Sequence, residues 1–333
     1  MNPNRNSAIL ENKKILTLRR NVSMKKFLVL GLSVCLLLCV ATGAFAAKYA
    51  VILKTTNSDF WRTMYDGTAK YAKENNLEVD MFAAQSDIDY EGQLAILENC
   101  INSGQYAGIA IAPCNGVNLI AGVKKANEAG ITIWNIDEKF DAAEMERQGA
   151  VCVGFDSSDN VQIGHMGGEY LASLLKAGAQ VAVIEGLAGN QSSEDRANGA
   201  KAAFKEANMN IVAAKSCDWD RQTAMDTAMT WIQQFPDLKA IYCCNDGMAM
   251  GAIQAVIVAG KVGEIYVCGT DGDTDAVQSV KDGNLTATVA QDSASIGITG
   301  LKGVVAAVEN PEKYPASHSP EKTPVAAILV SSK

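Results

Sequence analysis

A set of polar and aromatic side chains follows short apolar runs along this sequence, either directly or within about one helical turn. Carboxylates, amides and guanidinium groups are planar donors and acceptors that suit the hydroxyl groups of a sugar. Flat aromatic rings suit the C–H faces of a pyranose. The combination therefore favours a carbohydrate-binding site. Its candidate residues are Lys54, Phe60, Trp61, Asp137, Glu138, Arg196, Trp219, Asn245, Asp271 and Gln291.

Simpler roles compete with this interpretation. Ser192, Asp220 and Asp246 are good helix N-caps, and Asp137 and Asp271 are of a type that often forms turns. Aromatic residues at helix starts are more often part of the core than of a ligand site. No single residue decides between these roles. Their recurrence after one strand-like run after another favours binding.

Other kinds of chemistry find little support. The sequence lacks GxxxxGK[ST], a strand-following GxGxxG, HExxH and GxSxG, so it predicts no enzyme activity and no cofactor. The acidic run that starts at Asp271 resembles the start of a calcium loop, but Ala276 and Asp282 occupy positions that need Gly and Glu. We therefore expect no metal site. A net charge of −8 argues against a nucleic-acid partner, which needs a basic face.

The apolar runs alternate with amphipathic segments, and this alternation predicts a doubly wound parallel sheet. Since 333 residues and so many strands exceed one open sheet, we expect two lobes. Amphipathic segments include 60–74, 118–128, 192–207 and 221–235. The predicted strands are 49–54, 77–82, 108–112, 131–136, 150–155, 181–185, 210–215, 240–245, 265–270, 286–291 and, at the end, 325–330.

Residues 24–46 have the pattern of an export signal. Lys25 and Lys26 precede an apolar stretch, and Ala44 and Ala46 match an A-x-A cleavage site, so we expect cleavage after Ala46. The apolar stretch is short for a membrane anchor, which is the rival interpretation. The seven cysteines beyond this point include no CxxC pair, and we interpret them as buried thiols rather than disulfides.

At this point the sequence resembles a known family, the periplasmic sugar-binding proteins of the ribose type, and most closely their allose-binding members. The resemblance covers almost all of residues 48–310. It is carried by VILKTTNSDFW, GIAIAPCNGVNL, IWNIDEKFD, IEGLAGNQSSEDRANGAKAAFKEA, DWDRQTAMD, AIYCCNDGMAMGAIQAV, GTDGDTDAV and LTATVAQDSASIGITGLK.

This resemblance implies two lobes joined by three crossings, the type I periplasmic binding protein fold, with a monosaccharide bound between them. It implies lobes of 47–156 plus 292–322 and of 157–291 plus 323–333, after a leader of 1–46. It also implies a periplasmic location, an inner-membrane ABC permease as partner, and the candidate residues above as sugar contacts. We expect a monomer. The alternative function is ligand presentation to a chemoreceptor or a sensor kinase.

The sugar expected is a hexopyranose, with D-allose favoured over ribose. As the resemblance implies, ribose-binding members carry Phe at Trp61, Arg at Glu138 and Asn at Ala112. A larger ring at Trp61 offers more stacking area, and a smaller sugar would leave Lys54 or Glu138 buried without a partner. The family commonly reads Asn-Pro where this chain has Ser58-Asp59, so that wall of the site differs.

Overall fold

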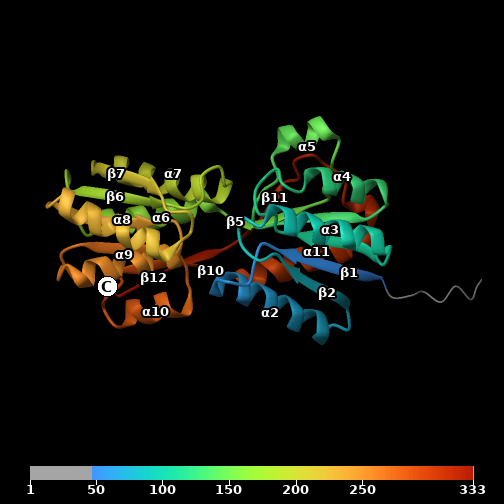
Figure 1. Ribbon diagram of the computed structural model, residues 1–333, viewed down its shortest axis with the longest axis horizontal. Helices are drawn as coiled ribbons and strands as arrows, with labels where there is room; N and C mark the ends of the chain where they lie inside the picture. The colour runs from blue at the N-terminus through green and yellow to red at the C-terminus, as the bar shows by residue number, and fades with distance from the viewer. Residues whose placement is uncertain (1–46, 333) are drawn as a thin grey trace, which may run out of the picture. The chain divides into compact units, whose positions relative to one another are not determined.

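The computed structural model describes residues 47–332 and contains two six-stranded sheets (Figure 1). The predicted export signal and its cleavage site lie outside the described residues, apart from Ala47. We call the elements around the first sheet the first lobe. They are β1 (Lys48–Leu53), α2 (Asp59–Glu74), β2 (Glu78–Ala83), α3 (Tyr90–Ser103), β3 (Tyr106–Ile111), α4 (Ile120–Glu128), β4 (Thr132–Ile136), α5 (Ala142–Gln148), β5 (Phe155–Ser158), α11 (Ser293–Glu309), the short 3₁₀ helix η1 (Pro311–Lys313) and β11 (Lys322–Val325).

The second lobe is built in the same way around the second sheet. Its elements are α6 (Asn160–Ser173), β6 (Gln180–Glu185), α7 (Gln191–Glu206), β7 (Asn210–Ser216), α8 (Arg221–Gln234), β8 (Leu238–Cys243), α9 (Asp246–Val258), β9 (Tyr266–Asp271), α10 (Thr274–Lys281), β10 (Ala287–Gln291) and β12 (Ala327–Ser331). Helices α6 and α7 pack against each other, as do α8 and α9.

The strand orders confirm two parallel α/β lobes. The first sheet has the order β11-β5-β4-β3-β1-β2, and every pair in it is parallel. The second has the order β12-β10-β9-β8-β6-β7, with β12 antiparallel to β10. The chain crosses between lobes after β5, after β10 and after β11, so the predicted three-segment connection is also confirmed.

Two predicted boundaries differ from the structure. The run 150–155 was predicted as a strand, but β5 begins at Phe155, and Cys152 makes only an isolated bridge to Ser317. The indole of Trp134 lies against Gly154, where the incoming segment passes. Strand β5 then continues to Ser158, two residues beyond the predicted boundary of the first lobe.

The C-terminal segment forms two strands where one was predicted. Residues 322–325 pair with β5 and stay in the first sheet, so 323–325 do not belong to the second lobe as expected. Pro324 is tolerated because β11 lies at the edge of its sheet. The third crossing therefore falls at Ala326, between β11 and β12.

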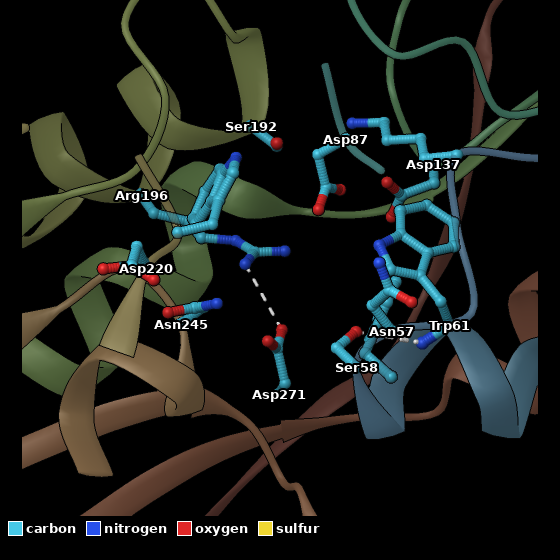
Figure 2. Close-up of a pocket in the computed structure, with 13 residues that line it drawn as sticks. Asn57, Ser58, Trp61, Asp87, Asp137, Ser192, Arg196, Asp220, Asn245 and Asp271 are labelled. Atoms are coloured by element: carbon cyan, nitrogen blue, oxygen red, sulfur yellow. Dashed lines mark hydrogen bonds and ion pairs between the residues drawn. The ribbon is translucent and has the colours of Figure 1, made fainter. Parts of the chain in front are cut away.

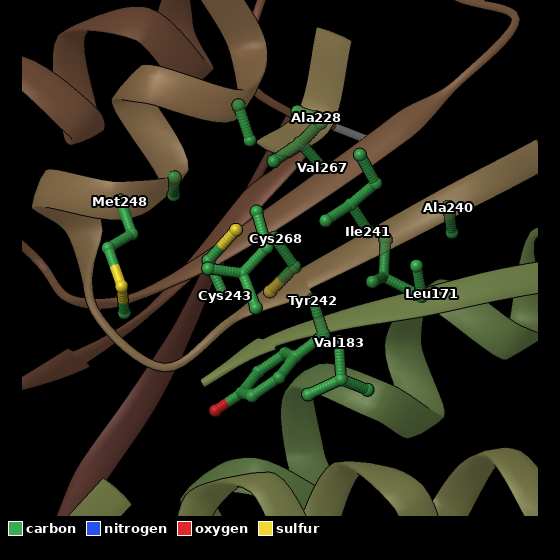
Figure 3. Close-up of a cluster of buried hydrophobic side chains, with 14 of the residues drawn as sticks. Leu171, Val183, Ala228, Ala240, Ile241, Tyr242, Cys243, Met248, Val267 and Cys268 are labelled. Carbon is green, nitrogen blue, oxygen red and sulfur yellow. The ribbon is translucent and has the colours of Figure 1, made fainter. Parts of the chain in front are cut away.

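Burial on both faces of the central strands explains their uninterrupted apolar sequences. In the second lobe, Tyr242, Cys243 and Cys268 lie among aliphatic side chains of the core (Figure 3). All seven cysteines of the described residues are free and buried, as predicted. No helix within 47–332 is long and apolar enough to cross a membrane.

Candidate functional site

A cavity of about 320 Å³ lies between residues of the two lobes, beyond the carboxyl ends of their strands (Figure 2). Its lining is almost entirely polar or aromatic. The first lobe contributes Lys54, Asn57, Ser58, Phe60, Trp61, Asp87 and Asp137. The second lobe contributes Ser192, Arg196, Trp219, Asp220, Asn245 and Asp271.

The start of α2 sets the aromatic wall of the first lobe. Ser58 is the N-cap, and its hydroxyl accepts a hydrogen bond from the Trp61 backbone N–H at 3.4 Å. This cap places Phe60 and Trp61 in the first helical turn. Their rings meet edge to face with centroids 5.0 Å apart, and both are buried. The Lys54 ammonium lies 5.6 Å from the Trp61 ring centroid.

Arg196 is the fixed cation of the second lobe. Its Nε donates to Asn160 Oδ1 at 2.8 Å, and its Nη1 donates to the Cys244 carbonyl at 2.9 Å. Nη1 also lies 3.3 Å from Asp271 Oδ1. Helix α6 approaches closely at Gly164, where a Cβ would lie 1.9 Å from the Arg196 carbonyl oxygen. The contacts to Asn160, Cys244 and Asp271 hold the guanidinium in one orientation.

The turn after β7 presents an indole to the cavity. Asp218 and Trp219 have left-handed backbones, with φ of 53° and 64°, which a non-glycine residue adopts at a cost. Asp220 then caps α8 by accepting from Thr223 N at 2.7 Å. The Trp219 indole lies over Gly186, where a Cβ would stand 2.2 Å from the ring. Strain at such a turn is common where a side chain must be aimed at a ligand.

Three further polar groups lie at or just beyond the carboxyl ends of their strands. Asp137 has a φ of 61°, and its backbone N–H donates to the Asp156 carbonyl at 2.7 Å. Asp271, with a φ of 123°, accepts from Gln291 Nε2 at 2.7 Å. Asn245 caps α9 through Oδ1, which accepts from Met248 N at 2.8 Å. Figure 2 shows these side chains directed at the cavity from both lobes.

The charges lining the cavity are close together and poorly hydrated. Burial raises the pKa of Asp137, and the positive charges of Lys54 and Arg196 offset only part of that rise. Burial also raises the pKa of Asp271 to about 6, against the opposing pull of Arg196. Burial lowers the pKa of Lys54, but Glu138 and other nearby carboxylates outweigh it, so the net shift is upward. Buried carboxylates of this kind are stabilised by hydroxyl donors from a ligand.

All the predicted site residues except Glu138 and Gln291 line the cavity. Gln291 instead donates from Nε2 to Oδ1 of Asp271, which lines the cavity, at 2.7 Å. Glu138 is fully buried beside Lys54, whose Nζ lies 3.3 Å from Oε2. A small sugar would therefore not leave Lys54 or Glu138 without a partner, contrary to the prediction, because the two pair with each other.

Sequence reasoning missed some lining residues and misassigned some caps. Asn57 and Asp87 follow β1 and β2, so the rule that found the other residues applies to them too. Ser192 was a predicted cap, but the cap position of α7 is Asn190. Asp246 was another predicted cap, yet it is fully buried and accepts from Thr288 Oγ1 at 2.8 Å.

Comparisons with known proteins agree with this geometry. Residues 49–312 match the family described as "Periplasmic binding protein domain". The "D-allose-binding periplasmic protein" of Escherichia coli (strain K12) is 45% identical over 297 residues, which cover 88% of this chain and 95% of that protein. The "D-ribose/D-allose-binding protein" of Pseudomonas aeruginosa is 35% identical over 257 residues, 77% of this chain and 80% of that one. A solved ABC transporter solute-binding protein from Actinobacillus succinogenes with bound D-allose is 26% identical, with a TM-score of 0.80, over 86% of this chain and 98% of its own.

Proposed function

Because the chain belongs to the periplasmic binding protein family, we propose that it captures a monosaccharide between its lobes and delivers it to an inner-membrane ABC permease. One observation carries this proposal. Carboxylates, amides, a guanidinium group and aromatic rings from both lobes converge on one cavity of about 320 Å³. That lining matches the hydroxyl groups and C–H faces of a sugar and offers no group set up for catalysis. The sugar is expected to leave unchanged.

D-allose is the favoured ligand, and ribose is the second candidate. The names of the relatives from E. coli and P. aeruginosa both include D-allose, and the second also includes D-ribose. The indoles of Trp61 and Trp219 face the cavity from opposite lobes and support a hexopyranose ring. Since Lys54 and Glu138 pair with each other, they do not favour D-allose over ribose.

Binding is expected to couple to closure of the lobes. A ligand favours the closed state only by contacting both lobes, and the cavity is lined from both. The units proposed to move are 48–158 with 293–325 and 160–291 with 327–332, which meet at the three crossings. X-ray scattering should therefore give a smaller radius of gyration with sugar than without it.

Export and partners complete the proposal. We expect cleavage after Ala46, so N-terminal sequencing of exported protein should begin at Ala47-Lys48-Tyr49. The proposed carrier acts as a monomer in the periplasm. Presentation of the bound sugar to a chemoreceptor was the alternative role, and no feature of the described residues favours it over transport.

The direct test is calorimetry of the protein with D-allose, D-ribose, other aldohexoses and inositols. We expect D-allose to bind with micromolar affinity or better, which corresponds to about 8 kcal/mol. The sugar should be recovered intact afterwards. Absence of binding to every aldose would overturn the proposal. The transport part of the proposal predicts loss of D-allose uptake when this protein is deleted from its source cell, and unchanged uptake would contradict it.

A further inference from the structure

Glu138 does not itself line the sugar cavity, but its side chain joins the two lobes beside Ser192, which does. Its Oε1 accepts from the Gln191 backbone N–H at 2.8 Å, and its Oε2 accepts from Ser192 Oγ at 2.8 Å. Glu138 belongs to the first lobe, whereas Gln191 and Ser192 begin α7 in the second. The side chain is fully buried. A first-lobe carboxylate is thus held mainly by second-lobe donors.

Helix α7 depends on this carboxylate at its N-terminus. Within the described residues, Asn190 occupies the cap position, but its side chain accepts from no backbone N–H of α7, and its Oδ1 instead shares the Ser192 hydroxyl, at 2.8 Å, with Glu138. The Asn190 amide donates to the Cys114 carbonyl of the first lobe at 3.2 Å. The first N–H groups of a helix need acceptors, and its positive end favours an anion. Glu138 supplies both a hydrogen-bond acceptor and a negative charge from the opposite lobe.

Other helices facing the cavity supply their own caps. Ser58, Asp220 and Asn245 each accept a hydrogen bond from the first turn of the helix that follows them. Helix α7 carries Arg196, the buried cation that the second lobe contributes to the cavity. The start of α7 is therefore completed by a residue of the opposite lobe.

We propose that Glu138 is a positioning residue that caps α7 only when the lobes are closed, and so stabilises the closed, sugar-bound state without contacting the sugar. We call Glu138 with the Gln191 N–H and the Ser192 hydroxyl the interlobe cap. Opening the cleft separates these groups and exposes them to water. The inference rests on the proposed function, because it requires that the lobes close around a bound sugar.

Lys54 connects the interlobe cap to the cavity. Its ammonium lines the cavity and lies 3.3 Å from Glu138 Oε2. A sugar that contacts Lys54 therefore contacts a group that pairs with Glu138 of the interlobe cap. Loss of the Glu138 charge would leave the buried ammonium without its nearest counter-ion, which penalises the closed state.

The main test is Glu138→Gln. Ser192→Ala removes a donor from the opposite lobe, and because Ser192 also lines the cavity, only its coupling to Glu138→Gln is compared and not its own loss of affinity. We expect Glu138→Gln to raise Kd about tenfold to a hundredfold for every sugar that the wild type binds. Stopped-flow indole fluorescence should show faster dissociation with little change in association, because the cap forms after encounter. The double variant should lose less than the sum of the single losses. Glu146→Gln, on the exposed face of α5, is the matched control.

The possible results distinguish the interlobe cap from a direct sugar contact and from failure of the proposed function. Unchanged affinity in a folded Glu138→Gln variant, or strictly additive losses with Ser192→Ala, would overturn the interlobe cap. A loss confined to one sugar, with the affinities for its epimers kept, would place Glu138 in contact with the ligand instead. If the wild type binds no sugar at all, the proposed function itself fails, and that outcome is seen before any variant is made.

Discussion

Arg196 Nη1 lies 3.3 Å from Asp271 Oδ1 in the wall of the cavity, with both side chains almost fully buried. The same guanidinium donates hydrogen bonds to the Asn160 side chain and to the Cys244 carbonyl. Since a buried ion pair is costly unless its remaining donors and acceptors are satisfied, the pair favours a ligand rich in hydroxyl groups.

Arg196→Lys should weaken sugar binding at least tenfold. A lysine keeps the charge but cannot bond to Asn160, Cys244 and Asp271 at once with the rigid fork of a guanidinium. Charge-assisted hydrogen bonds contribute about 1.5–3 kcal/mol each. Calorimetry measures the change. Arg221→Lys is the control, because Arg221 pairs with Asp275 on the surface and should leave the affinity unchanged. Equal affinities for the wild type and Arg196→Lys would remove the guanidinium from the binding site.

Sugar affinity should fall as the pH drops below about 6. Burial raises the pKa of Asp271 from 3.8 to about 6, so the folded protein binds this proton more tightly than the unfolded chain. This group therefore favours folding at low pH, and its contribution is lost as the pH rises from 3.8 through 6. Sugar hydroxyls that donate hydrogen bonds to Asp271 favour its ionised form. Sugar binding should therefore be strongest at high pH, which is opposite to the effect of this group on folding. Kd should rise about tenfold per pH unit below 6.

Isothermal titration calorimetry between pH 4.5 and 8 measures this dependence of Kd on pH. Asp271→Asn should bind more weakly at neutral pH and lose most of the slope below pH 6. Asp237→Asn, an exposed carboxyl of the second lobe, should keep the wild-type profile. A slope that survives in Asp271→Asn would assign the titration to another group of the cavity.

The contrast between Asp137 and Glu138 shows where sequence reasoning stops. Periodicity predicted both lobes and most of the strands, and the ends of those strands located most of the cavity. Which of two adjacent carboxylates lines the cavity depends on the left-handed φ of 61° at Asp137, a turn that no periodic pattern specifies. The role of Glu138 depends on the opposite lobe, some fifty residues away in sequence, and no local signal encodes that contact.

The C-terminal strands illustrate the same limit. One strand was predicted at 325–330, yet residues 322–331 form an edge strand in each sheet. The single intervening residue, Ala326, lies at the crossing. Only the pairing partners, β5 and β10, determine where one strand ends and the other begins.

Gly186→Ala should weaken binding without removing any polar contact. A Cβ at this position would stand 2.2 Å from the Trp219 indole, so the ring must move away from the cavity wall. Losing an aromatic contact of about 0.5–1.5 kcal/mol lowers affinity about two- to tenfold. Gly247→Ala is a control in the same region, because its Cβ meets no atom nearer than 3.4 Å. If Gly186→Ala binds as tightly as the wild type, Trp219 does not stack on the sugar.

Trp61→Phe should shift the preference from D-allose toward ribose. As the resemblance implies, ribose-binding members carry Phe at this position. The smaller ring loses stacking area that a hexopyranose uses more fully than a pentose. The substitution also removes the larger ring beside the Lys54 ammonium, which lies 5.6 Å from its centroid. We expect the ratio of the Kd for D-allose to the Kd for ribose to rise about threefold or more, in line with the usual size of a stacking contact. Trp231→Phe is the matched control, since Trp231 lies in the core of the second lobe and its loss should lower the melting temperature without altering that ratio. Thermal-shift and calorimetric titrations with both sugars measure the ratio and the melting temperature together. A ratio that stays constant in Trp61→Phe would mean that sugar selection depends on the polar groups of the cavity and not on the size of this ring.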